Sequence, residues 1–237
     1  MEGAPSFLLA VITAPDFFPG EAACLQELLA AGLEKLHLRK PGGSKEEMEA
    51  LLGQIAPCWY SRLVLHPQAA KAGKTAGSRE LVHLAARYGI PQIHCPLKDL
   101  VRPDAGLPGP EFAGLHTVWP VPRITGQETE IAVSASLHDW SAIKEIERAG
   151  LAYVFMSPVF HSLSKPGYAA NPLLRHRPAD TLPCKVIGLG GVDKDTLGLL
   201  IREGWEGGAV LGYIWENPRD AVKRYEQLRK VIEDNCP

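Results

Sequence analysis

The sequence of 237 residues lacks the features that mark several large classes of protein. It contains no run of about 18 apolar residues, so a membrane-spanning helix is not expected. Its five cysteines are scattered without a Cys-x-x-Cys pair, which argues against a disulfide framework or a cysteine zinc site. The formal charge is only -2, and it provides no long-range attraction to nucleic acid or an anionic membrane. We therefore expect small-molecule partners.

Common catalytic motifs are absent as well. No Ser-His-Asp, His-x-x-x-His or Gly-x-Gly-x-x-Gly pattern supports hydrolase, zinc or dinucleotide chemistry. The start, MEGAPSFLLAVITAPDFF, has a short apolar run and no positively charged residue before it, so it resembles a first strand rather than a signal peptide. These absences favour a cytoplasmic protein. The sequence does not fix the oligomeric state, and a homo-oligomer is compatible with it.

What the chain does contain is an alternation of short aliphatic runs and longer amphipathic stretches, which is typical of βα units in a parallel sheet. Strands are predicted at 7–13, 33–39, 62–66, 91–95, 131–136, 152–157, 185–190 and 208–214. Helices are predicted at 20–31, 44–55, 78–88, 139–149, 194–203 and 217–232. Eight strands favour a single-domain (β/α)₈ TIM barrel over residues 1–237, and a seven-strand interpretation would leave a doubly wound sheet.

Two local patterns refine this fold prediction. Ser44 and Glu47 have the spacing of a capping box, and a glycine follows four of the predicted helices, at positions 32, 89, 150 and 204. The segment around 96–130 is rich in proline and is expected to be an irregular loop, although LHTVW at 115–119 resembles a further strand.

In such a barrel the loops after the strands build the active site, so the polar residues just past each strand are the candidates. They include cations, hydroxyls and glycines, which suit anionic ligands. In chain order the candidates are Arg39, Lys40, His66, His94, Asp99, Ser134, Ser136, His138, Ser162, Ser164, Lys165, Gly190, Gly191 and Gly212.

The segment 162–165 carries two hydroxyls and an ammonium, which suit phosphate oxygens, and the glycines after the next strands bring backbone N–H groups to the same charge. The alternative for this segment is an ordinary exposed turn. Arg39 and Lys40 form a pair of cations suited to pyrophosphate, and the alternative for them is surface solvation. Gly190 and Gly191 also suit a tight turn with positive φ.

The remaining candidates have equally open interpretations. Asp99 offers a carboxylate for Mg²⁺, or it is a cap or turn residue. His138 either caps the helix predicted after it or contacts ligand. His66 ends a strand, where a hydrogen-bonded core histidine is the alternative to a ligand contact.

Together these motifs resemble the thiamine phosphate synthase family of small (β/α)₈ barrels. The resemblance spans most of the chain in the right order, and its strongest segment is S-P-V-F-x-S-x-S-K at 157–165, close to the family's G-P-V-F-x-T-x-T-K. The other matching segments are LHLRK at 36–40, IHCPLKD at 93–99, SASLH at 134–138, VIGLGGV at 186–192 and GAVLGYI at 208–214.

The resemblance implies a transferase of thiamine biosynthesis, which joins hydroxymethylpyrimidine pyrophosphate to thiazole phosphate with the help of Mg²⁺. On this interpretation Lys165 stabilises the leaving pyrophosphate and Ser136 lies near the reacting centre. The implied substrate contacts are Arg39, Lys40, His66, His138, Ser162, Ser164, Gly190, Gly191 and Gly212, and the implied metal ligand is Asp99.

The chain departs from the family at several of these positions. The family's Asn-Asp after strand three, whose aspartate is a second metal ligand, is replaced by His66 and Pro67, which should weaken Mg²⁺ binding. The serine of the last strand is replaced by Gly212. Two alternatives therefore stay open: a thiazole tautomerase, although Pro158 occupies its usual histidine position and His161 lies three residues on, and a non-catalytic sensor of thiamine precursors.

Overall fold

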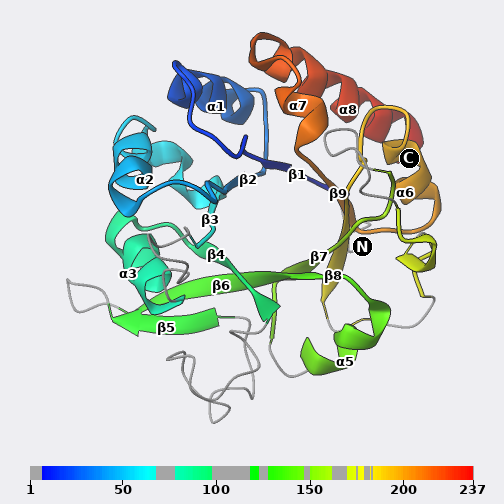
Figure 1. The fold of residues 1–237 in the computed structure, drawn as a ribbon, viewed down its shortest axis with the longest axis horizontal. Helices are drawn as coiled ribbons and strands as arrows, with labels where there is room; N and C mark the ends of the chain where they lie inside the picture. The colour runs from blue at the N-terminus through cyan, green and yellow to red at the C-terminus, as the bar shows by residue number, and fades with distance from the viewer. Residues whose placement is uncertain are drawn as a thin grey trace, which may run out of the picture.

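The computed structural model describes residues 7–67, 78–97, 118–122, 128–146, 150–161, 170–174, 176–178, 182 and 184–236. Within these residues, eight parallel strands form a closed ring surrounded by helices (Figure 1). The strands are β1 (Leu8–Ile12), β2 (Lys35–Leu38), β3 (Leu63–Leu65), β4 (Gln92–Cys95), β6 (Glu128–Leu137), β7 (Tyr153–Met156), β8 (Lys185–Leu189) and β9 (Gly207–Val210). The predicted (β/α)₈ barrel is confirmed.

The register shows how the ring closes. Neighbouring strands pair in parallel around the barrel, from β1 with β2 through to β8 with β9, and β9 pairs back with β1. The step from β4 to β6 skips one strand, with His94 opposite Ser134. The skipped strand, β5 (Val118–Pro122), lies outside the ring and pairs antiparallel with the first half of β6.

The α-helices are α1 (Glu21–Ala30), α2 (Lys45–Leu52), α3 (Ser78–Tyr88), α5 (Ile143–Ile146), α6 (Leu197–Arg202), α7 (Gly212–Trp215) and α8 (Ala221–Asn235). Short 3₁₀ helices lie at Pro57–Arg62, Trp140–Ala142, Pro172–Leu174 and Pro218–Asp220. The predicted capping box at α2 is present, since Ser44 Oγ accepts the N–H of Glu47 and the Glu47 carboxylate accepts the N–H of Ser44. All four predicted cap glycines have positive φ.

Two sequence-based boundaries are wrong. The last strand was expected over 208–214, but it ends at Val210, and the segment from Gly212 to Trp215 is helical because it turns away from the ring to pack against α8. The segment around 96–130 is not irregular throughout, because it contains β5 and the start of β6. A strand near 115–119 was considered from the sequence, and β5 starts at Val118 within it.

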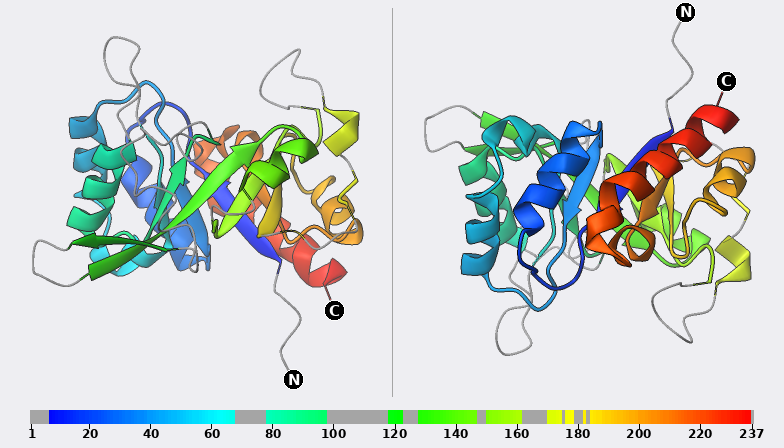
Figure 2. Two further views of the ribbon diagram at one scale, coloured as in Figure 1. Left: turned by 90° about the horizontal axis from the view of Figure 1, so that it is seen from below. Right: turned by 90° about the horizontal axis from the view of Figure 1, so that it is seen from above.

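Most of the core lies between the barrel and its helices. Alternate residues of each strand, such as Leu36 and Leu38 of β2, point outward into this layer and pack with the apolar faces of the helices. The start of β1 and the end of α8 lie on the same side of the molecule (Figure 2). Since the eight ring strands run parallel, their carboxyl ends all face the opposite side.

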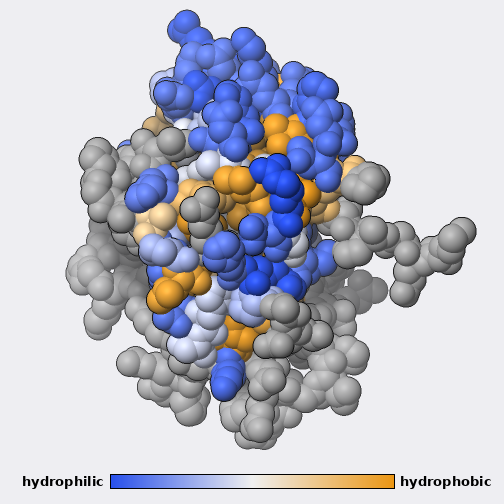
Figure 3. Space-filling view, turned by 90° about the vertical axis from the view of Figure 1, so that its right-hand side faces the viewer, coloured by the Kyte–Doolittle hydropathy of each residue, from blue (hydrophilic) through white to orange (hydrophobic). Residues whose placement is uncertain are grey.

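Hydrophilic and hydrophobic residues both contribute to the described surface (Figure 3). Figure 3 shows one side of the molecule, where hydrophobic residues are interspersed among hydrophilic ones. Among the described residues, Leu173 is the one large hydrophobic side chain that is largely exposed, at 76%. No helix in the described part of the chain is both long enough and apolar enough to cross a membrane.

Candidate functional site

The interior of the barrel is divided into an apolar half and a polar half. The apolar half comes from β1, β7, β8 and β9 and consists of Leu8, Ala10, Ile12, Tyr153, Phe155, Ile187 and Ala209. The polar half comes from β2, β3, β4 and β6 and includes the buried side chains of His37, His66, Gln92, His94 and Ser134. Buried polar groups need hydrogen-bond partners, so this second half has to be organised by specific contacts.

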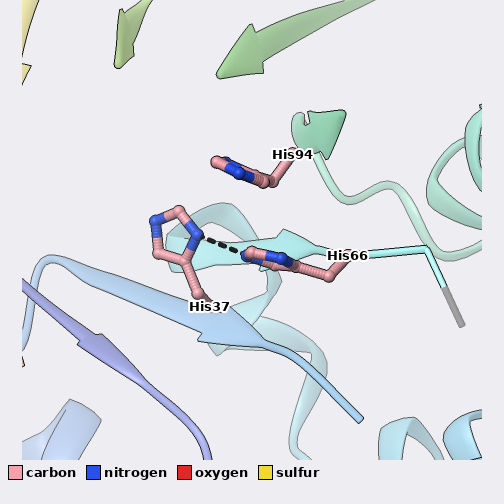
Figure 4. A group of neighbouring side chains, drawn as sticks. All are labelled: His37, His66 and His94. Carbon is pink, nitrogen blue, oxygen red and sulfur yellow. Dashed lines mark hydrogen bonds between the residues drawn. The ribbon is translucent and has the colours of Figure 1, made fainter. Parts of the chain in front are cut away.

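Three histidines form the centre of the polar half (Figure 4). His37 lies in β2, His66 directly follows β3 and His94 lies in β4. His37 Nδ1 and His66 Nε2 are 2.9 Å apart and share a hydrogen bond. The His66 and His94 rings stack, with their centroids 4.3 Å apart. The interpretation of His66 as a hydrogen-bonded core histidine is confirmed by this arrangement.

The neighbours of His94 determine which of its nitrogens carries the proton. Ser134 Oγ donates to the carbonyl of Ile93 at 3.3 Å, so this oxygen accepts from His94 Nδ1, which is 3.0 Å away. A neutral imidazole has one N–H, and His94 Nε2 therefore has a free lone pair. The hydroxyl of Ser136 donates to this atom at 3.0 Å. Ser136, predicted near the reacting centre, is thereby fixed against His94.

His37 connects the histidines to the apolar half. Its Nε2 lies 2.7 Å from the hydroxyl of Tyr153, and its ring packs against Phe155 with centroids 4.7 Å apart. The chain of contacts thus runs from Tyr153 through His37 to His66. Each hydrogen bond in it fixes the orientation of the next ring.

All three imidazoles are neutral at ordinary pH. Burial, followed by the nearby Arg39 guanidinium, lowers the pKa of His94 to about 3. Burial is also the main cause that lowers the pKa values of His37 and His66, followed by the electrostatic influence of His94. The cluster therefore offers nitrogen lone pairs rather than positive charges.

Lys40 is bound to protein groups on every side. Its ammonium donates to the carbonyls of Ala14 and Asp16, each at 2.9 Å, and to the Glu21 carboxylate at 2.5 Å. An ammonium has three N–H groups, so this arrangement leaves none for a ligand. Lys40 is also fully buried, whereas Arg39 beside it is half-buried. The predicted contact of Lys40 with pyrophosphate does not fit this arrangement, which gives the residue a structural role.

The ion pair between Lys40 and Glu21 is shaped by burial. Burial raises the pKa of the Glu21 carboxyl and lowers the pKa of Lys40, and the attraction between the two groups opposes both shifts. Glu21 is in the first turn of α1, so the pair joins this helix to the end of β2. Phe17 covers the ammonium, with its ring centroid 4.7 Å from Lys40 Nζ.

Glycine is required at positions 190 and 191 because two loops pack closely there. Their φ angles are 97° and 65°, in the region that favours glycine. A Cβ atom on Gly191 would lie 2.2 Å from the carbonyl oxygen of His161, and one on Gly190 would lie 2.9 Å from Pro158 Cα. The loop after β8 therefore lies directly against the loop after β7, the segment that carries the strongest family motif.

The other described candidates lie near the same rim. His138 is exposed and its Nδ1 donates to the carbonyl of Ser157 at 2.8 Å, which connects the ends of β6 and β7. The capping interpretation of His138 is wrong, because Asp139 caps the following turn by accepting the N–H of Ser141. Gly212 begins α7, after the end of β9. His161 is exposed, and its Nδ1 accepts the N–H of Ala170 at 3.3 Å.

Four predicted site residues lie outside the described residues: Asp99, Ser162, Ser164 and Lys165. Their proposed roles stay predictions. Two interior residues, His37 and Tyr153, were not singled out from the sequence. Their signal is a polar group at the inward position of a strand whose neighbours are aliphatic, as in the KLHL of β2.

The described donors near the end of β3 do not fit Mg²⁺. Magnesium prefers oxygen ligands, whereas the position after this strand offers the imidazole of His66 and then Pro67. The group of His, Cys or carboxylate side chains that includes His66 consists otherwise of two further imidazoles, and it contains no carboxylate.

Comparison with known proteins supports the family suggested by the motifs. Residues 121–214 match the family model described as thiamine monophosphate synthase, which confirms the resemblance over somewhat less than half of the chain. The match runs from β5 to α7 and includes the two loops that meet at Gly191. A search of curated proteins found no significant match.

Several solved structures share the fold. A thiamine phosphate pyrophosphorylase from Bacteroides thetaiotaomicron is 24% identical, with a TM-score of 0.64, over 96% of this chain and 98% of that one. Another from Pyrococcus furiosus is 16% identical, with a TM-score of 0.66, over 98% of each chain. A 3-keto-L-gulonate-6-phosphate decarboxylase from Vibrio cholerae is 11% identical, with a TM-score of 0.57, over 99% of this chain and 100% of that one. At these identities the likeness shows the barrel fold and does not assign an activity.

Proposed function

We propose, from the family match of residues 121–214, that this protein is a transferase of thiamine biosynthesis that joins hydroxymethylpyrimidine pyrophosphate to thiazole phosphate. The products would be thiamine phosphate and pyrophosphate. The family match is the observation that carries the proposal. The contact between the loops after β7 and β8 supports it, because these loops hold the predicted phosphate-binding residues.

The proposed chemistry needs charge stabilisation more than a general base. Departure of pyrophosphate would leave a pyrimidinyl carbocation, which the thiazole nitrogen captures. Lys165 would stabilise the leaving group, and Ser162, Ser164 and the backbone of Gly190 and Gly191 would bind phosphate oxygens. Arg39 is the cation after β2 that is left for the substrate, since Lys40 is bound to Glu21. Binding of Mg²⁺ stays a prediction that depends on Asp99.

The first experiment mixes the purified protein with both substrates and follows pyrophosphate release, with and without Mg²⁺. We expect release that requires both substrates. Lys165→Ala should lower kcat by on the order of a hundredfold, because it removes a charge at the leaving group. Lys185→Ala is the matched control, since Lys185 is exposed at the opposite, amino-terminal end of β8, and it should leave kcat unchanged.

Other outcomes would redirect the assignment. If no pyrophosphate is released either with or without Mg²⁺, the synthase proposal is ruled out. Binding of thiazole phosphate without release would favour a tautomerase or a non-catalytic sensor of thiamine precursors. These two are separated by following isomerisation of the thiazole, with His161 the residue to substitute because it is exposed on the loop after β7.

A further inference from the structure

We propose that His37, His66 and His94 form a binding site for one divalent transition-metal ion of the Zn²⁺ type, with three imidazole ligands inside the barrel. The three residues each place one ring nitrogen so that the three atoms lie within 4.8 Å of one another. His37 and His94 lie in β2 and β4, and His66 directly follows β3, which lies between these two strands (Figure 4). This inference goes beyond the proposed transferase activity and does not depend on it.

The donor set determines the class of metal. Three imidazoles suit Zn²⁺, Co²⁺, Ni²⁺ and Cu²⁺, whereas Mg²⁺ and Ca²⁺ require oxygen ligands. A metal-binding imidazole has to be neutral, and all three rings are buried away from water, which disfavours the protonated form. Three protein ligands leave a further coordination position for water or another small ligand. The site would therefore bind a metal ion with an open position.

The surrounding hydrogen bonds resemble the second layer of contacts found around metal-binding histidines, in which the non-ligating N–H is held by an oxygen. Ser134 Oγ holds the Nδ1 proton of His94, so the lone pair is on Nε2, where a metal ion would replace the hydrogen bond from Ser136. The hydroxyl of Tyr153 lies 2.7 Å from His37 Nε2, so it can accept from this atom and leave Nδ1 as the ligand. Two of the three rings are thus already oriented by such oxygens.

Metal binding requires the side chains to rearrange. The stacked rings of His66 and His94 have to turn so that their in-plane lone pairs converge on one ion, and Ser136 has to release its hydrogen bond to His94 Nε2. Nitrogens bound to one tetrahedral ion at about 2.0–2.1 Å lie roughly 3.3 Å apart, so the 2.9 Å hydrogen bond between His37 and His66 has to be replaced and the widest separation has to close. His66 lies just beyond the end of β3, whereas His37 and His94 are within strands. The proton shared by His37 and His66 moves to the other nitrogen of one ring, so both rings stay neutral and no net proton is released.

Cobalt gives a direct test in the full-length protein. After treatment with a chelator, the protein is titrated with Co²⁺ without substrates, and visible absorption is recorded. We expect one Co²⁺ per chain with the intense bands of a four-coordinate site, displaced by one equivalent of Zn²⁺. The weak spectrum of six-coordinate aqueous Co²⁺ throughout the titration would overturn the proposal. Pyrophosphate release is a separate measurement, so either proposal can fail without the other.

Substitutions identify the ligands. His66→Gln and His94→Gln should each weaken Co²⁺ binding by at least tenfold, whereas His83→Gln, an exposed histidine on α3, should not change it. Unchanged affinity in the first two variants would contradict the assignment. If these variants misfold, X-ray absorption of the zinc-loaded wild-type protein counts the imidazole ligands directly. Three imidazoles are expected, and one or none would overturn the proposal.

Discussion

At the scale of single residues, Gly191 shows how strongly one position is constrained by a neighbouring loop. Its φ is 65°, and any Cβ would lie 2.2 Å from the carbonyl oxygen of His161. Gly89 has nearly the same φ, 66°, but a Cβ there would meet no atom within 4 Å. The two glycines therefore separate the cost of the backbone conformation from the cost of the contact.

We expect Gly89→Ala to lower the free energy of unfolding by about 1 kcal/mol, because alanine disfavours this region of φ. Gly191→Ala should cost at least about 2 kcal/mol more, since the backbone has to shift to relieve the overlap. Urea unfolding of both variants measures the difference. Equal losses in the two variants would show that the loops after β7 and β8 are not in close contact in solution.

At the scale of secondary-structure elements, the buried pair of Glu21 and Lys40 joins α1 to the end of β2. Removal of one partner from a buried ion pair leaves an uncompensated charge and typically costs about 3–5 kcal/mol. Both side chains have little exposure, 3% and 0%. If Lys40 were instead a surface lysine that only binds substrate, its substitution would change the free energy of unfolding by no more than about 0.5 kcal/mol.

A double-mutant cycle tests this structural role. Glu21→Gln and Lys40→Met should each lower the free energy of unfolding by about 3 kcal/mol or more, and the double variant should lose much less than the sum. Arg87 and Glu49 provide a control pair, because Arg87 is 59% exposed, and the same cycle there should give a coupling of at most about 1 kcal/mol. If Lys40→Met changes the free energy of unfolding only slightly, the structural role is wrong and Lys40 is again a candidate for substrate binding.

At the scale of the whole molecule, the buried histidines make stability depend on pH. In the unfolded chain a histidine has a pKa of about 6.5, whereas in the fold the pKa of His94 is about 3 and those of His37 and His66 are also lowered. As the pH falls below about 6.5, the unfolded chain binds protons that the folded protein does not. The stability contributed by neutral histidines is therefore present above this pH and is lost as the pH falls toward about 3.

We expect the metal-free protein to lose a few kcal/mol of unfolding free energy between pH 7.5 and 5.5, on the order of 1 kcal/mol for each histidine. Burial is the largest cause of these shifts, followed by the neighbouring histidines and by the cations Arg39 and Lys35, all of which disfavour protonated rings. Urea unfolding with a chelator at a series of pH values measures the slope. His94→Gln should reduce the slope by about one third. A stability that does not change over this range would show that the rings take up protons without unfolding.

The sequence was sufficient to predict the order of the ring strands, because buried parallel strands are short aliphatic runs bounded by turns. It was not sufficient to predict the end of β9. The residues GYI at 212–214 have a composition typical of a strand, and only their packing against α8 shows that they are helical. Within the site, His66 and Ser136 were predicted from their positions at strand ends. Lys40 and Glu21 are separated by 19 positions in the sequence, and His37 and Tyr153 by 116 positions. Periodicity does not reveal contacts between residues so far apart in the chain.

The division of the barrel interior has a consequence for how the chain tolerates sequence change. On the side of β1, β7, β8 and β9, an aliphatic residue can be replaced by another of similar volume with only a small loss of folding stability, because the substitution has to preserve packing alone. On the side of His37, His94 and Ser134, each exchange also removes a donor or an acceptor from a shared chain of hydrogen bonds. Variation compatible with folding should thus be unequal around the ring, and permissive positions for redesign lie on the apolar side.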